Sequence, residues 1–236
     1  MIHYQEWDST FFCKKIYKVN IDAESILPDQ LGDIIIELKR LNAEAAYFIL
    51  SSINEEWALA FKIFGVKCID EKIVFEKNLK DTELQIPDFN IETYKGELNE
   101  DLVNIGLEAG KYSRFKKDIK FNDKYQALYT KWIENSLAGL IADTFLVYLK
   151  GGKIRGLVTG KITGNIGTIG LIAAHPQAQR QGIGWALLTA AEIAFASKKI
   201  NTAEVATQSE NISACAFYEK AGYHIKSITP IYHFWF

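Results

Sequence analysis

The turn at residues 175–184 constrains the fold more than any other feature, because it joins a strand-like run to an apolar helix through two glycines. Residues 166–174 (IGTIGLIAA) predict a strand that ends at His175-Pro176, since proline cannot continue a central strand. The run Q-R-Q-G-I-G then leads into apolar positions at helical spacing. Its glycines let the backbone come close to a ligand, and the first N–H groups of a helix have no internal partner. The turn therefore suits a bound pyrophosphate.

The C-terminal half of the chain alternates strand-like runs with helices. Gly151-Gly152 and Thr163-Gly164-Asn165 separate the first three runs and have the chemistry of tight hairpin turns, which predicts an antiparallel meander. A further helix is expected from Asn211 to Lys220, with Gly222 just after its end. The strands predicted in this half are 145–150, 154–161, 166–174, 200–208, 223–227 and 231–236.

The rest of the chain predicts three helices and two strands. The helices are expected at 31–41, 54–64 and 122–139, and the strands at 47–50 and 72–79. Asn54 is the expected cap of the second helix and Gly65 its stop, while Asn122 and Gly139 have the same roles in the third.

The polar tract at 81–90 has no clear periodicity and predicts a domain boundary. We expect an N-terminal α/β subdomain over residues 1–85, on the acceptor side, and a larger domain over 86–236. The predicted fold class is α/β with a mixed sheet.

Charge and cysteine content exclude several classes of protein. The 236 residues carry 27 Lys+Arg and 29 Asp+Glu, a net charge of −2, which argues against a nucleic-acid-binding protein. The three cysteines are scattered, so neither a disulfide framework nor a metal site is expected. The sequence has neither a secretory signal nor a run of about 18 apolar residues. We therefore expect no membrane partner and a cytoplasmic location.

In this order the elements resemble the GCN5-related N-acetyltransferase (GNAT) superfamily over roughly residues 145–236. The resemblance rests on the strand that enters His175-Pro176, Q-x-x-G-x-G at 179–184, a helix and a second strand, Asn211-x-x-Ala214, and Phe217-Tyr218 ahead of Gly222-Tyr223. It implies a mixed sheet with two splayed central strands. It also implies an acyl-CoA-dependent N-acyltransferase that uses acetyl-CoA or another short-chain acyl-CoA and no metal.

The same resemblance implies a site for coenzyme A. Its pantetheine would lie between the splayed strands, near 169–174 and 205–208, and its pyrophosphate would lie on the glycine turn. The implied cofactor-binding residues are Ile172, Ala173, Ala174, Gln179, Arg180, Gln181, Gly182, Ile183, Gly184, Asn211 and Ala214. Tyr218 would lie near the thioester sulfur.

A narrower resemblance covers nearly the whole chain and concerns dTDP-fucosamine (dTDP-4-amino-4,6-dideoxygalactose) N-acetyltransferases and related dTDP-aminosugar N-acyltransferases. It rests on W-D-S-x-F-F from Trp7, S-R-F from Ser113, W-I-E-N-S from Trp132, A-A-H-P from Ala173 and V-A-T-Q from Val205. Cys13 stands where this resemblance implies glycine. The implied acceptor is a dTDP-amino-dideoxyhexose, used in the synthesis of surface polysaccharide such as lipopolysaccharide O-antigen.

Acyl transfer from a thioester to an amine needs a deprotonated amine, a stabilised oxyanion and a proton for the leaving thiolate. Tyr218 is the expected catalytic residue, as the general acid for the thiolate. The general base stays open among His175, His3, Glu6, Glu71 and a chain of water molecules. The candidate substrate-binding residues are Trp7, Phe11 and Phe12, which can stack on thymine, and Arg114, which can pair with a diphosphate.

Two alternatives remain. The acceptor amine could belong to a protein N-terminus, a polyamine or an aminoglycoside, or the chain could be an acyl-CoA-binding module without catalytic activity. The aromatic C-terminal run IYHFWF also leaves open a homodimer formed by strand pairing.

Overall fold

A computed structural model describes residues 1–50, 53–80 and 90–236, and these divide into two compact units. Unit 1 comprises Met1–Ile73, Gln208–Glu210 and Ser227–Phe236, and unit 2 comprises Val74–Thr207 and Asn211–Lys226. The boundary expected between residues 85 and 86 lies outside the described residues and stays a prediction.

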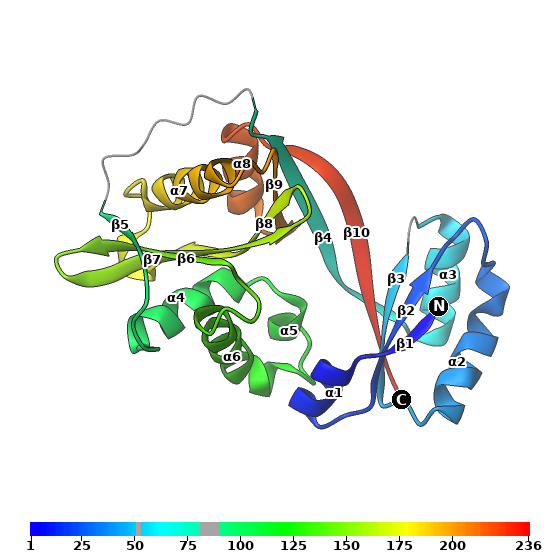
Figure 1. Ribbon diagram of the computed structural model, residues 1–236. Coiled ribbons are helices and arrows are strands. Elements are labelled where there is room, and N and C mark those ends of the chain that lie inside the picture. Colours follow the sequence, from blue (N-terminus) through cyan, green and yellow to red (C-terminus); the bar gives the residue numbers. More distant parts are fainter. Residues whose placement is uncertain (51–52, 81–89) are drawn as a thin grey trace. The chain divides into compact units, whose positions relative to one another are not determined.

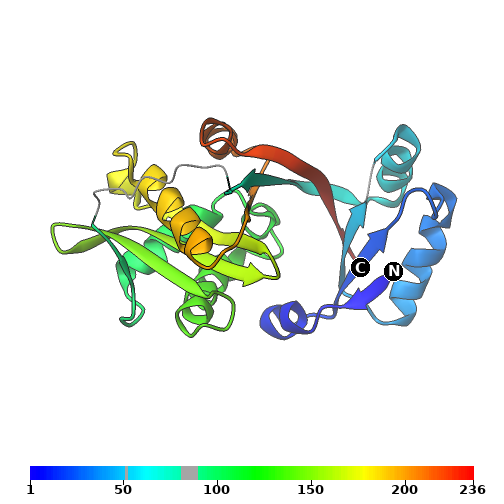
Figure 2. The same ribbon diagram turned by 45° about the horizontal axis from the view of Figure 1, so that its top comes forward.

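Unit 1 is a small mixed sheet with helices on one side of its central strands. Its strands follow the order β1-β2-β3-β10, in which β2 and β3 run parallel and the other neighbours are antiparallel. Figure 2 shows α2 and α3 on the same side of β2 and β3. The elements are β1 (Ile2–Tyr4), α1 (Glu6–Phe12), β2 (Ile16–Ile21), η1 (Pro28–Gln30), α2 (Leu31–Arg40), β3 (Ala45–Leu50), α3 (Glu55–Phe64) and the end of β10 (His224–Trp235).

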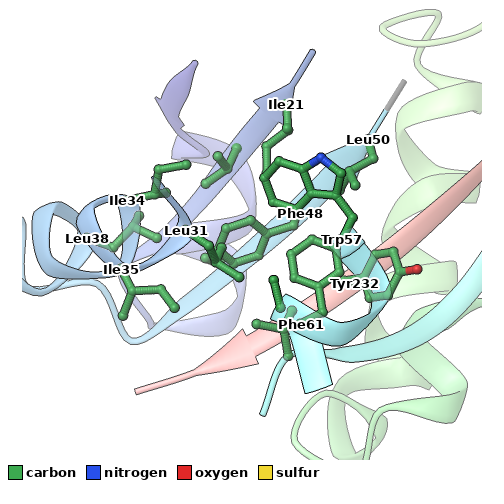
Figure 3. Packing of buried hydrophobic residues seen from close by; sticks show 14 of the residues in the cluster. Ile21, Leu31, Ile34, Ile35, Leu38, Phe48, Leu50, Trp57, Phe61 and Tyr232 are labelled. Carbon is green, nitrogen blue, oxygen red and sulfur yellow. The ribbon is translucent and has the colours of Figure 1, made fainter. Parts of the chain in front are cut away.

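The core of unit 1 is built around aromatic rings that pack edge to face or tilted against one another (Figure 3). Phe61 of α3 contacts Phe48 of β3 and Tyr232 of β10, with ring centroids 5.7 and 4.3 Å away. The helix α2 adds its buried aliphatic side chains, which are Leu31, Ile34, Ile35 and Leu38. These are the positions whose spacing predicted the helix, and burying each such side chain contributes about 1.5–3 kcal/mol.

The ends of α3 follow from capping chemistry. The Asn54 side chain accepts a hydrogen bond of 2.9 Å from the Trp57 N–H, and Gly65 has φ +72° at the other end. Both predicted boundaries are therefore confirmed.

Unit 2 contains the predicted meander and most of the helices. The strand order is β10-β4-β9-β8-β7-β6-β5, with antiparallel β6–β7 and β7–β8 pairs and a parallel β8–β9 pair. Its elements are the end of β4 (Lys67–Asn78), the start of β10, and β5 (Ile91–Thr93), α4 (Glu100–Gly110), α5 (Arg114–Lys117), η2 (Asn122–Lys124), α6 (Tyr125–Leu137), β6 (Thr144–Lys150), β7 (Lys153–Thr163), β8 (Ile166–Ala174), η3 (Pro176–Ala178), α7 (Ile183–Ser197), β9 (Thr202–Gln208) and α8 (Ile212–Lys220). Figure 1 shows α7 on one face of β6–β8 and α4 and α6 on the other.

Three glycines let α7 lie close against the sheet. A Cβ atom at Gly156 would lie 2.7 Å from Ile183 Cγ2, at the start of α7. At the other end of the helix, the Phe195 ring covers Gly160 and Gly167, where a Cβ atom would lie 2.8 and 2.5 Å from the ring. Such distances are too short for carbon atoms, so these positions exclude side chains and fix the height of α7 above β7 and β8.

A buried ion pair joins α7 to β4. Lys77 donates to both carboxylate oxygens of Glu192, at 3.0 and 3.1 Å, and the two side chains are 15% and 3% exposed. Lys77 also lies over the Tyr223 ring, 5.5 Å from its centroid. Burial and the Glu192 charge raise the pKa of Tyr223.

The structure corrects two predicted elements. Asn122 does not cap the helix expected at 122–139, because its side chain accepts from Lys116 and a short 3₁₀ turn precedes α6. The strands expected at 223–227 and 231–236 are one strand, β10. Pro230 does not end it, because an extended backbone accepts proline where its N–H is not needed for pairing.

Cys13 ends α1 in the left-handed conformation, with φ 54° and ψ 44°. Its N–H bonds back to the Ser9 and Thr10 carbonyl groups. A residue with a Cβ atom is strained in this region, whereas glycine is not. This explains why the resemblance implies glycine here.

We expect Gly167→Ala to lower the free energy of unfolding by about 1–3 kcal/mol, because the added methyl group overlaps the Phe195 ring. Urea denaturation followed by circular dichroism measures the change. The control is Gly32→Ala in α2, where the Cβ atom meets Phe64 at an ordinary 3.4 Å. Equal stability of the two variants would contradict the tight seating of α7.

We expect Cys13→Gly to raise the free energy of unfolding by about 1 kcal/mol, because glycine removes the left-handed strain. The same denaturation experiment measures it, with Cys68→Gly as the control in the extended backbone of β4, where glycine should destabilise. A loss of stability in Cys13→Gly would show that the cysteine side chain outweighs the strain.

Candidate functional site

The parallel strands β8 and β9 separate part-way along their length. They pair from Ile166–Thr202 to Ile169–Val205, and beyond this point both strands continue without further pairing to each other. The predicted splay of the two central strands is therefore confirmed. It leaves main-chain groups on the facing edges of both strands.

A β-bulge lies where β8 leaves β9. The register with β7 shifts so that Gly170 and Leu171 both oppose Thr159. The buried Thr159 hydroxyl accepts a 2.8 Å hydrogen bond from the Leu171 N–H and so satisfies a group that the bulge would leave unpaired. Sequence reasoning did not single out Thr159, and a lone threonine in a strand gives no signal for this role.

The bulge sets the direction of the following N–H groups. The Leu171 N–H points toward β7, and so does that of His175, which bonds to the Arg155 carbonyl at 2.9 Å. Because N–H groups alternate along a strand, those of Ile172 and Ala174 point the other way, toward the side on which β9 no longer pairs with β8. These are among the main-chain groups predicted to contact pantetheine.

The glycine turn is uncapped and has no acidic residue of its own, and the Glu108 carboxylate of α4 accepts a 2.7 Å hydrogen bond from the Gln179 side chain. Gly182 starts α7 with φ +79°, Arg180 has φ +60°, and the side chains of residues 179–181 are exposed. No side chain caps the helix and no acidic residue lies in its first turn. Lys150 adds a positive charge, since it donates to the Gln181 side chain at 2.8 Å. The first amides of α7 and the positive end of its dipole are thus available to an anion.

Tyr218 is buried in α8 among three other aromatic rings. The ring centroids of Phe75, Phe217 and Tyr223 lie 5.6, 5.2 and 6.0 Å away. Burial, followed by the nearby Cys215, raises the pKa of Tyr218 well above its ordinary value. The phenol therefore keeps its proton at neutral pH.

Asn211 links the end of β9 to α8. Its side chain accepts from the Ala214 N–H at 3.3 Å and donates to the Thr207 hydroxyl at 3.3 Å. The predicted start of this helix is confirmed. Contacts of Asn211 and Ala214 with a cofactor stay predictions.

His175 has a structural position at the entry to the turn. Its Nδ1 accepts a 3.2 Å hydrogen bond from the Gln177 N–H, so in the neutral ring Nε2 carries the hydrogen. Nε2 faces Asp101 Oδ1 at 4.0 Å. In this arrangement His175 has no free lone pair to accept a proton from an amine, which argues against it as the general base.

The predicted substrate-binding residues lie in both units. On α1 the rings of Trp7 and Phe11 stack with centroids 5.0 Å apart and an angle of 6°, and Trp7 is 47% exposed. Phe12 is 4% exposed, so it presents little surface to a ligand. Arg114 belongs to unit 2, where its guanidinium lies over the Phe115 ring. A shared role for these residues stays a prediction.

Unit 2 also has a pocket of about 400 Å³ that the sequence did not predict. Its lining includes His175, Tyr125 and Lys116, whose ammonium lies 4.8 Å from the centroid of the Tyr125 ring.

Among the described residues there is no group of three or more potential metal ligands. No helix in that part of the chain is long and apolar enough to cross a membrane.

The acetyltransferase (GNAT) family model matches residues 111–223, whereas no curated protein matches the chain. A functionally unknown conserved protein from Staphylococcus epidermidis ATCC 12228 is similar in structure, with 18% identity and a TM-score of 0.64 over 93% of this chain and 83% of that one. A GCN5-related N-acetyltransferase from Sphaerobacter thermophilus has 15% identity and a TM-score of 0.62 over 93% and 73%. A tandem GNAT protein from the clavulanic acid biosynthesis pathway has 14% identity and a TM-score of 0.58 over 93% and 75%.

At these identities the solved structures show a common fold. The matched segment contains the splayed strands, the uncapped turn and Tyr218. Residues 111–223, just under half of the chain, therefore match a GNAT acetyltransferase domain, and this match indicates an acyl-CoA-dependent transferase.

Proposed function

We propose that the protein transfers a short acyl group from acyl-CoA to the amino group of a dTDP-amino-dideoxyhexose, for the synthesis of surface polysaccharide. The observation that supports acyl-CoA binding is the early end of the β8–β9 pairing, because the Ile172 and Ala174 N–H groups point toward the side on which β9 no longer pairs. The whole-chain sequence resemblance supports the choice of acceptor.

Acyl-CoA fits the splayed strands in both shape and charge. Pantetheine carries two amides, which can pair with the main chain of Ile172–Ala174 as a third strand would. Its pyrophosphate then lies at the start of α7, where unpaired amides and the helix dipole favour two negative charges. Gln179 to Gly184 supply these amides, and their side chains leave the backbone accessible.

The reaction is a direct attack in a ternary complex. The acceptor nitrogen forms a bond to the thioester carbon, and the carbonyl oxygen becomes an oxyanion that a strand N–H can stabilise, worth about 3 kcal/mol. The carbon–sulfur bond then breaks, and Tyr218 gives its proton to the leaving thiolate. The amine loses its proton to His3, Glu6, Glu71 or a water molecule, the candidates that remain because His175 is poorly arranged to accept it. Holding both substrates in place contributes about 7–11 kcal/mol.

The stacked rings on α1 support a nucleotide acceptor. Trp7 lies flat against Phe11 and leaves nearly half of its surface exposed, which suits the face of a thymine base. Arg114, in unit 2, has the planar, always-charged guanidinium that suits a diphosphate.

We expect Tyr218→Phe to lower kcat at least tenfold while the affinity for acyl-CoA stays within about twofold, because only the acidic hydroxyl is lost. Release of free thiol measures turnover, and calorimetry measures binding. The matched control is Tyr223→Phe, because Tyr223 is also buried and its ring lies beside that of Tyr218. Wild-type turnover in Tyr218→Phe would remove this residue from the mechanism.

Incubation with dTDP- and UDP-aminosugars and several acyl-CoAs, followed by mass spectrometry of the products, tests the acceptor directly. We expect acylated dTDP-amino-dideoxyhexose, and we expect Trp7→Ala to raise KM for that sugar about tenfold with KM for acyl-CoA unchanged. The exposed Leu59 on α3 provides the control Leu59→Ala. Acylation of a polyamine or peptide alone, or binding without acceptor-dependent thiol release, would contradict the proposal.

A further inference from the structure

An exposed aromatic pair borders the glycine turn. Trp185 follows Gly184 directly, in the first turn of α7, and is 46% exposed. Within α7, all of which is described, it is the large apolar residue that is not covered, whereas Ile183 and Leu187 on either side are buried. Ile183 and Leu187 lie one turn apart on the face toward the sheet, so Trp185 lies on the opposite face, where the packing of the helix does not require an apolar side chain.

Phe217 of α8 holds this tryptophan edge to face. The two ring centroids are 6.4 Å apart and the rings are 81° to each other. Phe217 also lies over the glycine turn itself, because a Cβ atom at Gly184 would be 3.8 Å from its Cζ. The pair is thus continuous with the amides at the start of α7, and Ile212, which is 71% exposed, lies at the start of the same α8.

We propose that Trp185 is the platform on which the adenine ring of coenzyme A stacks, with Phe217 fixing the orientation of the indole. The inference rests on the proposed acyl-CoA site. In coenzyme A only one ribose separates the pyrophosphate from the adenine, so a pyrophosphate on the Gln179–Gly184 amides brings the base within reach of the neighbouring side chain. An indole is the side chain with the largest face for base stacking, and such stacking tolerates solvent exposure.

The ligand 4′-phosphopantetheine isolates this contact, because it keeps pantetheine and one phosphate but lacks adenosine. We expect Trp185→Ala in the full chain to weaken coenzyme A binding about tenfold in calorimetry and to leave 4′-phosphopantetheine binding unchanged. Trp185→Tyr keeps an aromatic face and should restore most of the affinity. Leu140→Ala, which removes another exposed apolar side chain of unit 2, should change neither ligand.

Other outcomes would overturn the assignment. Equal weakening of both ligands would place Trp185 against pantetheine or the phosphate, and no weakening would remove it from the site. Weaker binding of dTDP instead would assign the indole to the acceptor nucleotide. Loss of a dimer in sedimentation with unchanged coenzyme A affinity would make the pair an interface between copies.

The two ligands also separate failure of this inference from failure of the proposed function. If the wild-type chain bound neither coenzyme A nor 4′-phosphopantetheine, the proposed function would fail as well. If it bound both and Trp185→Ala had no effect, only the adenine contact would be refuted.

Discussion

The site depends on a pair of parallel strands that stop pairing before they end. A strand in the middle of a sheet normally has both edges satisfied, and a buried unpaired N–H is costly. Here β8 loses its partner after Ile169, so its outer edge must find hydrogen bonds elsewhere. The Thr159 hydroxyl satisfies the bulge on the inner edge, and the outer edge is where we propose that a ligand with amide groups pairs.

The second requirement is the position of α7. The amides at its start are useful only if they lie beside the open strand edge, and this depends on how closely the helix approaches the sheet. Gly156 controls that approach at the start of the helix, and Gly160 and Gly167 control it at the end, where Phe195 fills the room that two side chains would occupy. Binding chemistry at one end of the helix therefore relies on packing three turns away.

Local chemistry explains which parts were predictable from sequence. Asn54, Gly65 and Asn211 form their caps as expected because capping depends on a few neighbouring atoms. The helix α4 was missed although Asn99, followed by two acidic residues, is the same signal and its side chain caps Leu102. Asn122 is also an asparagine before a helical pattern, but its side chain accepts a hydrogen bond from Lys116 and does not cap the helix.

Tertiary features of the site were less accessible to sequence reasoning. The glycine turn and the splay followed from a family pattern, and the strand edges agree with it. The burial of Phe12, the stacking of Trp7 on Phe11 and the exposure of Trp185 depend on which face of a helix meets its neighbours. Adjacent apolar letters in a sequence do not distinguish these cases.

The buried Lys77–Glu192 ion pair determines how α7 is rotated about its own axis. Glu192 is the one charged residue of this helix, whose sides are otherwise apolar or small, so hydrophobic burial alone defines its rotation about its axis weakly. The Glu192 carboxylate reaches its buried ammonium partner at one rotation of the helix only. Any other rotation would leave a charge unpaired in the interior, at a cost of several kcal/mol. The ion pair thus fixes the rotation of α7. It also sets the direction in which the indole of Trp185 faces, although Glu192 lies two helical turns further along the chain.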